Sequence, residues 1–600
     1  MNRFLYRLLC LLLCLFVLLP SLLVFATETE EGSTDEEPSS SDVIPPAELT
    51  DEEKRSLLSA LYQADIATIR EAIRLRLITS RELTAYFLER IEAYNKTYNC
   101  FISLCDNALE IAEQRDAAIA AGEADGSLFG IPIVVKDNID YQGYHTTNGY
   151  KKKDSQIAKS NATVVENLLK EGAVILAKTN MSRGAQDARL SISSSVGETR
   201  NAYNIDLACG GSSGGSAVAT SLHFAAGSLG TDTNSSLRYP AALNGCVSLR
   251  PTSGLLDREG IVILNSKRDT PGAITRTVYD QAILLDAILG DGTYTDSLND
   301  QVLDGLRIGI LKELSAPVSS MSSRKKSKLD QEILDAFQRA VEELKACGAE
   351  IVEVSLPKVF SLSNACANNT KKSVNAFYTA FEALLKDNDI AAVIFPTYLH
   401  APQWRGVGES GTLKVYEQNF LTNVKILSPP LGIPEITVPI GTHSRGAGIG
   451  MEIASLRNND QLLLDMAYAY TTNFDHRAIP EGAPDLYAAY GSVSLADFIA
   501  DYRDSLTETE GPVSPPETTI PDTDPIAPLE SSDNTDELPE TTENVISPPR
   551  SNATKTLVIL LVVSVLALIA YSLYLVYLRR RSMRSYDRMR ERETSSDRRD

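Results

Sequence analysis

Short apolar runs alternate with helix-period segments between residues 51 and 500, and this alternation limits the fold more than any other feature of the chain. Strands that alternate with helices indicate an α/β fold, with a mainly parallel sheet buried between helices. No linker composition interrupts residues 55–500, so we expect one large domain over residues 51–500. The expected strands are 130–139, 173–177, 306–311, 351–354, 391–395, 431–440 and 448–453, and the expected helices are in 51–94 (one capped by Ser80) and at 105–122, 162–171, 329–346 and 459–474.

Acidic residues concentrate on both sides of this domain. The chain has a formal net charge of −22, and residues 27–54 carry eleven acids and one lysine, while residues 504–554 carry twelve acids and one arginine. Such segments bury too little apolar surface to order themselves. We therefore expect an acidic disordered linker over 27–50 and an extended Pro/Thr/Glu-rich stalk over 501–554. Because phosphate binding needs a basic surface, nucleic acid is not expected as a partner.

Two long apolar runs lie near the ends of the chain. Arg3 and Arg7 precede the first run, which predicts a signal peptide over 1–26, with an uncleaved signal anchor as the alternative. The second run, within 555–578, is long enough to span a bilayer of roughly 30 Å, with a buried core helix as the alternative. The Arg-rich tail, 579–600, follows this run and predicts a cytoplasmic C-terminus. We expect a single-pass protein of the cell membrane, with its body outside the cytoplasm.

The cysteines do not predict a metal centre. Six cysteines lie outside the predicted signal peptide, and no Cys-x-x-Cys pair occurs. Zinc and thioredoxin-type sites therefore have no support, and we expect no metal and no cofactor. Most of the six are expected to be buried as small hydrophobic residues, with any disulfide pairing left open.

Serine and glycine dominate residues 210–240, a composition that raises the question of a nucleophile. A serine nucleophile needs a base, and none of the five histidines lies in a Gly-x-Ser-x-Gly context. Lys136 ends an apolar strand, and burial can lower a lysine pKa from about 10.4 to near 7. Two alternatives stay open from the residues alone: Lys136 pairs with Asp137, and residues 210–216 form a glycine-rich turn capped by Ser216.

The same residues resemble the amidase signature family. The resemblance covers roughly 60–490 and rests on ordered motifs: GIPIVVKDN (130–138), KTNM (178–181), GGSSGGSAVA (210–219), GTDTNSSLRYPAALNGCVSLRPTSG (230–254), DTPG (269–272) and LGIP (431–434). It implies a large twisted mixed β-sheet enclosed by helices. It also implies amide hydrolysis by a Ser-Ser-Lys triad, with a small-molecule amide as substrate.

Individual roles follow only from that resemblance. Lys136 is the implied base, Ser212 the bridging serine on a cis peptide bond, and Ser236 the nucleophile. Backbone N–H groups would form the oxyanion hole; these belong to Thr233, Asn234, Ser235 and Ser236. Structural support is expected from Gly211, Ser213, Gly214, Asp232 and Arg238.

One departure from the family bears on activity. The family usually has two glycines before the nucleophile, where this chain has Asn234 and Ser235. If those positions need a positive φ, asparagine tolerates it and serine does so poorly. We therefore predict a membrane-tethered extracytoplasmic amidase with reduced activity possible. The alternative is a catalytically impaired pseudo-enzyme of the same fold that binds a ligand or an envelope partner. The substrate and the oligomeric state are left open.

Overall fold

The computed structural model describes residues 47–315, 329–368, 370–405, 423–491 and 494–509. The predicted signal peptide, the membrane-spanning run 555–578 and the tail 579–600 lie outside these residues, as do most of the linker and stalk. Within the described ranges, no helix combines the length and the apolar character needed to cross a membrane. The domain boundaries drawn from composition stay predictions.

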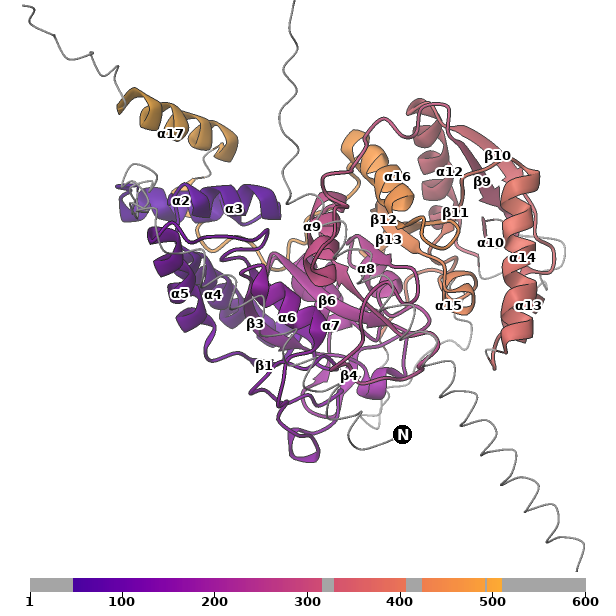
Figure 1. The fold of residues 1–600 in the computed structure, drawn as a ribbon, viewed down its shortest axis with the longest axis horizontal. Coiled ribbons are helices and arrows are strands. Elements are labelled where there is room, and N and C mark those ends of the chain that lie inside the picture. The colour runs from indigo at the N-terminus through magenta and orange to yellow at the C-terminus, as the bar shows by residue number, and fades with distance from the viewer. Residues whose placement is uncertain (1–46, 316–328, 369, 406–422, 492–493, 510–600) are drawn as a thin grey trace, which may run out of the picture. The chain divides into compact units, whose positions relative to one another are not determined.

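Five strands form the first sheet, in the order β1-β3-β2-β6-β8 (Figure 1). The central strands β3, β2 and β6 are parallel, and β1 and β8 pair antiparallel at the two edges. Strands β2, β3, β6 and β8 are buried along their whole length, as expected for strands covered on both faces. Their bounds are β1 (Phe101–Leu104), β2 (Pro132–Lys136), β3 (Val174–Thr179), β6 (Gly227–Asp232) and β8 (Thr270–Ile274).

Six strands form the second sheet, in the order β10-β9-β11-β13-β12-β7. Backbone hydrogen bonds of 2.9 and 3.0 Å between Val247 and Thr275 join it to the first sheet, beside β7 and β8. The bounds are β7 (Ser248–Arg250), β9 (Arg307–Leu311), β10 (Glu350–Val354), β11 (Ala392–Pro396), β12 (Glu435–Thr442) and β13 (Gly448–Ala454), with β4 (Ile192–Ser193) and β5 (Gly197–Glu198) forming a separate pair.

The sheet is mixed, so the expectation of a mainly parallel sheet from strand and helix alternation is wrong. In the two sheets four strand pairs are parallel and five are antiparallel. Strands β12 and β13 are joined by a short turn, which permits antiparallel pairing without a crossover helix. A strand buried on both faces has the same apolar pattern in either direction, so the pattern could not distinguish them. The mixed sheet agrees with the fold that the family resemblance implies.

Helices surround the sheets in Figure 1. Helix α7 packs on β2, β3, β6 and β8, while α12 and α16 pack on the second sheet. The helices are α2 (Asp51–Leu61), α3 (Ile66–Arg74), α4 (Ser80–Tyr98), α5 (Ala108–Ala120), α6 (Thr163–Lys170), α7 (Gly214–Ser221), α8 (Arg238–Leu243), α9 (Val278–Leu289), α10 (Lys312–Ser315), α12 (Gln331–Ala346), α13 (Val359–Ala365), α14 (Lys371–Asp387), α15 (Ser428–Leu431), α16 (Asp460–Asn473) and α17 (Leu495–Thr509), with short 3-10 turns at Lys152–Asp154, Arg183–Ala185 and Ala488–Tyr490.

Two expected local features differ from the structure. Thr79, rather than Ser80, caps α4, and its hydroxyl and the Glu82 carboxylate form a reciprocal capping box. Ser80 is the first helical residue, and its hydroxyl donates to the Gly130 carbonyl at 2.8 Å. The expected strand 431–440 begins later, at Glu435, because the two prolines at 429–430 start the short helix α15.

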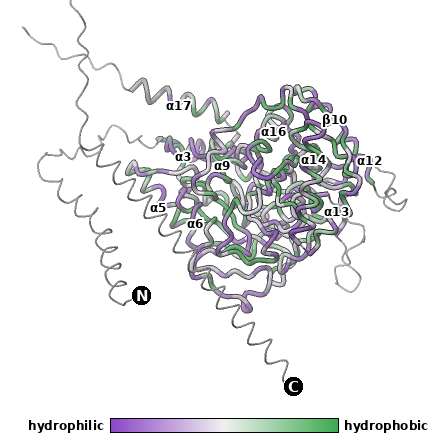
Figure 2. Tube along the Cα trace, turned by 45° about the vertical axis from the view of Figure 1, so that its right-hand side comes forward, coloured by the Kyte–Doolittle hydropathy of each residue, from purple (hydrophilic) through white to green (hydrophobic). Residues whose placement is uncertain are grey.

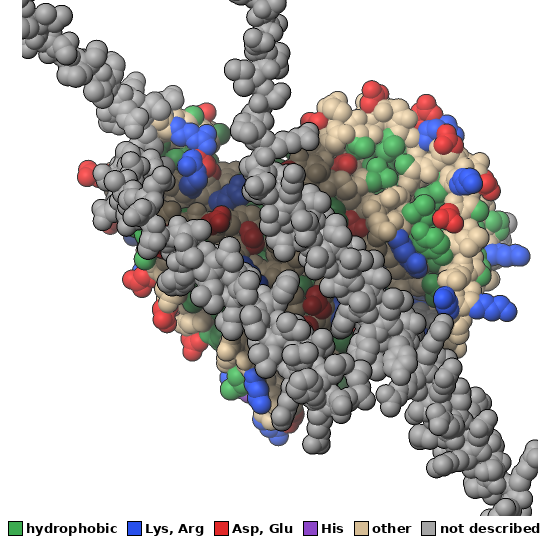
Figure 3. Space-filling view, in the orientation of Figure 1, with side chains coloured by type: hydrophobic (Ala, Val, Ile, Leu, Met, Phe, Trp, Pro, Cys, Tyr) green, Lys and Arg blue, Asp and Glu red, His purple; other side chains and the backbone are tan. Residues whose placement is uncertain are grey.

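Apolar residues concentrate in the interior of the described body, as Figure 2 shows in green. On the face that Figure 3 leaves uncovered, acidic and basic side chains are interspersed. Five of the six cysteines outside the predicted signal peptide are buried, and all six are free thiols, as expected for small core residues. The body therefore relies on an apolar core rather than on disulfides.

Candidate active site

The candidate site lies at the carboxyl ends of two neighbouring parallel strands. Lys136 is the last residue of β2, and Thr231 is the penultimate residue of β6 beside it. The carboxyl edge of parallel strands is where α/β folds commonly bind ligands. Ser212 lies in the turn before α7, and Ser236 lies in the loop between β6 and α8. This order of elements brings together residues far apart in the sequence.

Lys136 is fully buried and contacts three hydroxyl groups. Its Nζ lies 2.7 Å from Ser212 Oγ, 2.8 Å from Ser213 Oγ and 2.9 Å from Thr231 Oγ1. Burial lowers the pKa of Lys136 to about 7, although the nearby carboxylates of Asp232 and Asp269 partly oppose this. The amine is therefore about half neutral near pH 7.

The hydrogen-bond pattern directs the lysine lone pair toward Ser212. Ser213 Oγ donates its own hydrogen to the Thr231 carbonyl at 3.2 Å, so it accepts from Lys136. Thr231 Oγ1 accepts a second N–H of the amine. A neutral amine has two N–H groups and one lone pair, which leaves the lone pair for the Ser212 hydroxyl. Lys136 is thus arranged to take a proton from Ser212.

The alternative pairing of Lys136 with Asp137 is not what the structure contains. Asp137 Oδ1 lies 4.0 Å from Lys178 Nζ, and its other oxygen accepts from Thr147. Lys178 Nζ also donates to the Ile139 carbonyl at 2.5 Å. Side chains of successive strand residues point to opposite faces, which separates Lys136 from Asp137.

The serine loop before α7 is held from several sides. The Gly211–Ser212 peptide bond is cis, as the family resemblance implies. The Ser191 hydroxyl donates to the Gly210 carbonyl at 3.1 Å and accepts from the Gly214 N–H at 2.9 Å. A Cβ on Gly211 would lie 2.5 Å from the Asp187 carbonyl oxygen, so only glycine fits there. Gly211 and Gly214 therefore support the site as expected.

Ser213 and Ser216 do not cap α7. Ser213 occupies the N-cap position without a capping hydrogen bond, because its hydroxyl faces Lys136 and Thr231. Gly230 allows this approach, since a Cβ there would lie 2.8 Å from Ser213 Oγ. Ser216 lies inside the helix and donates to the Leu229 carbonyl at 2.9 Å. The cap alternative is wrong for both serines, because buried strand groups accept their hydroxyls instead.

Ser236 lies next to the serine loop. Its carbonyl accepts from the Ser213 N–H at 3.3 Å, and the residue is 6% exposed. Among the described residues, none forms a hydrogen bond with the Ser236 hydroxyl, so the contact from Ser212 to Ser236 is not formed here. Catalytic hydrogen bonds are often loose before substrate binds. The structure therefore places Ser236 in the site without closing the relay.

The four expected oxyanion-hole residues follow strand β6 directly. Within the described part of the chain, the backbone N–H groups of Thr233, Asn234, Ser235 and Ser236 donate to no protein acceptor. None of these residues has a positive φ. Asn234 and Ser235 thus adopt ordinary backbone conformations, and the strain considered for replacing two glycines does not arise.

Buried charges fix this loop from below. Arg238 pairs with Asp232 at 3.3 Å, with Glu452 at 3.6 Å and closely with Glu435. Burial would raise the pKa of Asp232, but Arg238 and Arg250 outweigh this and hold it below its usual value. Asp232 and Arg238 therefore act as braces, as expected. Three further partners had no local signal in the sequence, because they come from distant strands: Arg250, Glu435 and Glu452.

Two other supporting residues were also missed. Asp269 Oδ1 accepts from Thr233 Oγ1 at 2.6 Å, and its Oδ2 accepts from the N–H groups of Leu264 and Asn265. Asn138 Nδ2 donates to Thr231 Oγ1 at 3.0 Å. Both residues lie in the quoted motifs, so motif membership was the available signal.

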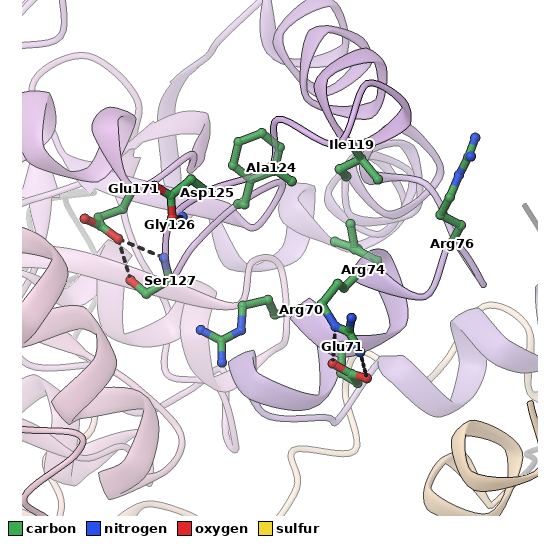
Figure 4. A pocket seen from close by; sticks show the side chains of 13 residues that line it. Arg70, Glu71, Arg74, Arg76, Ile119, Ala124, Asp125, Gly126, Ser127 and Glu171 are labelled. Carbon is green, nitrogen blue, oxygen red and sulfur yellow. Dashed lines mark hydrogen bonds and ion pairs between the residues drawn. The ribbon is translucent and has the colours of Figure 1, made fainter. Parts of the chain in front are cut away.

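Cavities show how little room the described walls leave at the site. A cavity of about 10 Å³ is lined by Asn138, Thr231, Thr233 and the apolar loop 261–264, which is enough for about one water molecule. A much larger cavity of about 690 Å³ lies elsewhere, between α3 and residues 122–129 (Figure 4). There Glu71 accepts two hydrogen bonds from Arg74, and Glu171 accepts from Ser127. Its charges pair with one another, and it does not include Lys136.

One group of side chains could be considered for a metal. Asp330, Glu332 and His443 bring one ligand atom each within 4.8 Å of the others. However, His443 Nδ1 accepts from the Arg445 N–H at 3.0 Å, so the proton of a neutral ring lies on Nε2. That atom faces Asp330 at 3.3 Å and Glu332 at 3.5 Å. A protonated nitrogen cannot coordinate a metal, so the cluster fits hydrogen bonding between histidine and carboxylates.

The mixed sheet, with a buried lysine against serine hydroxyls at its carboxyl edge, defines an α/β protein of the amide-hydrolase class. The family model that matches is Amidase, over residues 82–368. A glutamyl-tRNA(Gln) amidotransferase subunit of Bdellovibrio bacteriovorus is 30% identical over 485 residues, which cover 68% of this chain and 96% of that relative. The chain belongs to the amidase family.

Other similarities are consistent with this assignment. The same subunit from Thermoanaerobacter pseudethanolicus is 36% identical over 312 residues, covering 50% of this chain and 61% of that relative's length. Peptide amidase from Stenotrophomonas maltophilia is 27% identical, with a TM-score of 0.58, and the match covers 70% of this chain and 99% of that structure. The likeness therefore includes the fold as well as the sequence.

Proposed function

We propose that the chain hydrolyses a small-molecule amide through an acyl-enzyme on Ser236. The observation that carries this proposal is the buried Lys136 amine, which lies 2.7 Å from Ser212 Oγ and has a pKa of about 7. A base with a pKa near the working pH is well matched to proton transfer. A lysine kept only for packing would not need three hydroxyl partners.

The steps follow from the arrangement of the groups. Neutral Lys136 takes a proton from Ser212, which takes one from Ser236 as Ser236 Oγ attacks the amide carbonyl. The N–H groups of residues 233–236 stabilise the oxyanion. The relay then returns a proton to the departing amine, and water hydrolyses the ester on Ser236. Besides the substrate and water, these steps use only groups of this chain.

Labelling with a serine-directed fluorophosphonate tests the proposal on the full-length chain in detergent. We expect the wild type to be labelled, and Ser236→Ala and Lys136→Ala to lose labelling. Ser195→Ala is a matched control, because Ser195 is exposed in the turn between β4 and β5. Equal labelling of the wild type and the Ser236→Ala variant would contradict hydrolysis and favour the pseudo-enzyme alternative.

Relatives named as amidotransferase subunits raise transfer of ammonia to an acceptor as a second outcome of the same acyl chemistry. We propose hydrolysis instead. The acidic flanks do not favour a nucleic-acid acceptor, and the sequence predicts export of the body. Release of free ammonia or amine without an added acceptor would support hydrolysis, and acceptor-dependent turnover would contradict it.

We also propose that the body lies outside the cytoplasm and is tethered to the bilayer by residues 555–578. The support is in the sequence: an apolar run after Arg3 and Arg7, and a second run followed by Arg579, Arg580 and Arg581. In intact cells, added protease should digest the body and leave an epitope on the C-terminal tail protected. A body that resists protease until the cells are lysed would overturn this placement.

A further inference from the structure

Asn234 presents a side chain where the family usually has none. It is the exposed residue of the loop 233–236, and its carbonyl accepts from Arg238 Nη2 at 3.3 Å. Its side-chain Oδ1 accepts from Arg268 Nη1 at 2.9 Å. Asn234 is thus held at its backbone and at its side chain, one residue away from Ser235 and two from Ser236.

Arg268 is itself held in place by two further contacts. Its Nη2 donates to the Cys366 carbonyl at 2.7 Å, and its own carbonyl accepts from Arg250 Nη2 at 2.6 Å. Arg250 in turn donates to the Asp232 carbonyl at 2.7 Å, at the end of β6. The guanidinium therefore approaches Asn234 from a fixed position rather than from a freely moving side chain.

This contact determines which end of the Asn234 amide is available. A guanidinium carries only donors, so the oxygen of the amide must face Arg268 and the nitrogen must face away. Among the described residues, none accepts a hydrogen bond from Asn234 Nδ2. The loop thus has a side-chain donor with unused hydrogens, beside four backbone N–H groups that are also unused.

We propose that Asn234 Nδ2 is an additional oxyanion donor, directed to the carbonyl oxygen of the substrate amide, and that Arg268 is the residue that positions it. This inference rests on the proposed hydrolase function. An asparagine amide is a neutral donor that can stabilise developing negative charge without titrating. The replacement of glycine at 234 is then a functional gain rather than a loss of activity.

The rate of Ser236 phosphonylation by a fluorophosphonate measures this directly, because the phosphoryl oxygen of the probe takes the place of the oxyanion. Loss of one oxyanion donor slows the reaction on the order of 10²–10³-fold. We expect a decrease of that order for Asn234→Gly and Asn234→Ala. Asn234→Gly labelling as fast as the wild type, or faster, would overturn the proposal.

Arg268 is tested through its partner. Arg268→Met should slow labelling by about tenfold, since the Asn234 amide is then free to rotate, and Arg268→Lys should recover part of the rate because it keeps a donor. In the Asn234→Gly background, Arg268→Met should have no further effect, as expected for a residue that acts only through Asn234. A full additional loss in that background would show a separate structural role and overturn the positioning role.

Two controls separate the possible failures. Lys267→Met removes a neighbouring positive charge from the same loop and should label at the wild-type rate; thermal unfolding of each variant identifies loss of fold. If the wild type labels and the Asn234 variants match it, only this inference fails. If the wild type does not label, the hydrolase proposal fails, and the inference fails with it.

Discussion

At the scale of single residues, the site depends on how one lysine is buried. Lys136 has no carboxylate in contact, although Asp137 is its neighbour in the sequence. Instead it contacts hydroxyls, which solvate a neutral amine but stabilise a positive charge less than a carboxylate would. Burial therefore dominates and brings the pKa to about 7.

The pH dependence of activity follows from this pKa. Lys136 must be neutral to accept a proton, so kcat/KM should rise as pH increases through about 7 and level off above it. Measurement of kcat/KM between pH 5 and pH 9 checks this. A rate that stays flat down to pH 5 would show that Lys136 is not the base.

The same group gives a stability test with a definite sign. The folded-state pKa of about 7 lies below the unfolded value of about 10.4, so the unfolded chain binds more protons between these limits. The contribution of Lys136 to the free energy of unfolding should therefore increase from pH 7 to pH 10. Lys136→Met should remove that part of the pH dependence, as measured by denaturant unfolding at several pH values.

At the scale of elements, α7 can approach the first sheet only because it begins with glycines. A Cβ on Gly215 would lie 2.6 Å from the Asn180 nitrogen and 2.6 Å from the Cys100 carbonyl oxygen, both backbone atoms. This close packing is what places Ser212 and Ser213 over Lys136. The glycine content of residues 210–216 thus reflects helix packing as well as the site.

Gly215→Ala should therefore destabilise the protein. Overpacking a buried contact costs about 1–3 kcal/mol in the free energy of unfolding. Gly143→Ala is the matched control, because its new Cβ meets no atom within 4 Å and it pays only for a φ of +86°, about 1–2 kcal/mol. Denaturant unfolding compares the two. A Gly215→Ala variant as stable as the wild type would contradict the packing argument.

At the scale of the whole molecule, buried charges connect the two sheets. Arg238 joins Asp232 at the end of β6 to Glu435 in β12 and Glu452 in β13. Burial and the proximity of Glu452 raise the pKa of Glu435, which shows that this carboxyl depends on the arginine to stay ionised. The nucleophile loop is therefore fixed relative to both sheets.

Removal of the arginine should cost far more than removal of a surface charge. Arg238→Met leaves three buried carboxyls without their cation, and breaking a buried pair typically costs about 3–5 kcal/mol. Lys345→Ala, which removes an exposed partner of Glu342, should cost no more than about 1 kcal/mol. Denaturant unfolding measures both, and an equal effect of the two variants would contradict the bracing role.

Much of the fold and of the site could be read from local patterns. Most expected strands and helices, the mixed sheet implied by the motifs, and the identities of Lys136, Ser212 and Ser236 are local in the sequence. Strand direction was not predictable from composition, because strands buried on both faces have the same pattern whether parallel or antiparallel. Strand β12 begins later than its apolar pattern predicts, because two prolines open a short helix before it.

The sequence by itself determined the motifs, the family resemblance and the candidate residues, since these depend on residue type and spacing. Only the tertiary structure decided which groups meet. Lys136 reaches Ser212 across 76 residues, Arg238 reaches Glu435 across 197, and Arg268 reaches Asn234 across 34. Contacts of this kind depend on strand order and on the packing of glycine-lined elements. Local spacing carries no record of either, so the burial that lowers the lysine pKa emerges only in the folded protein.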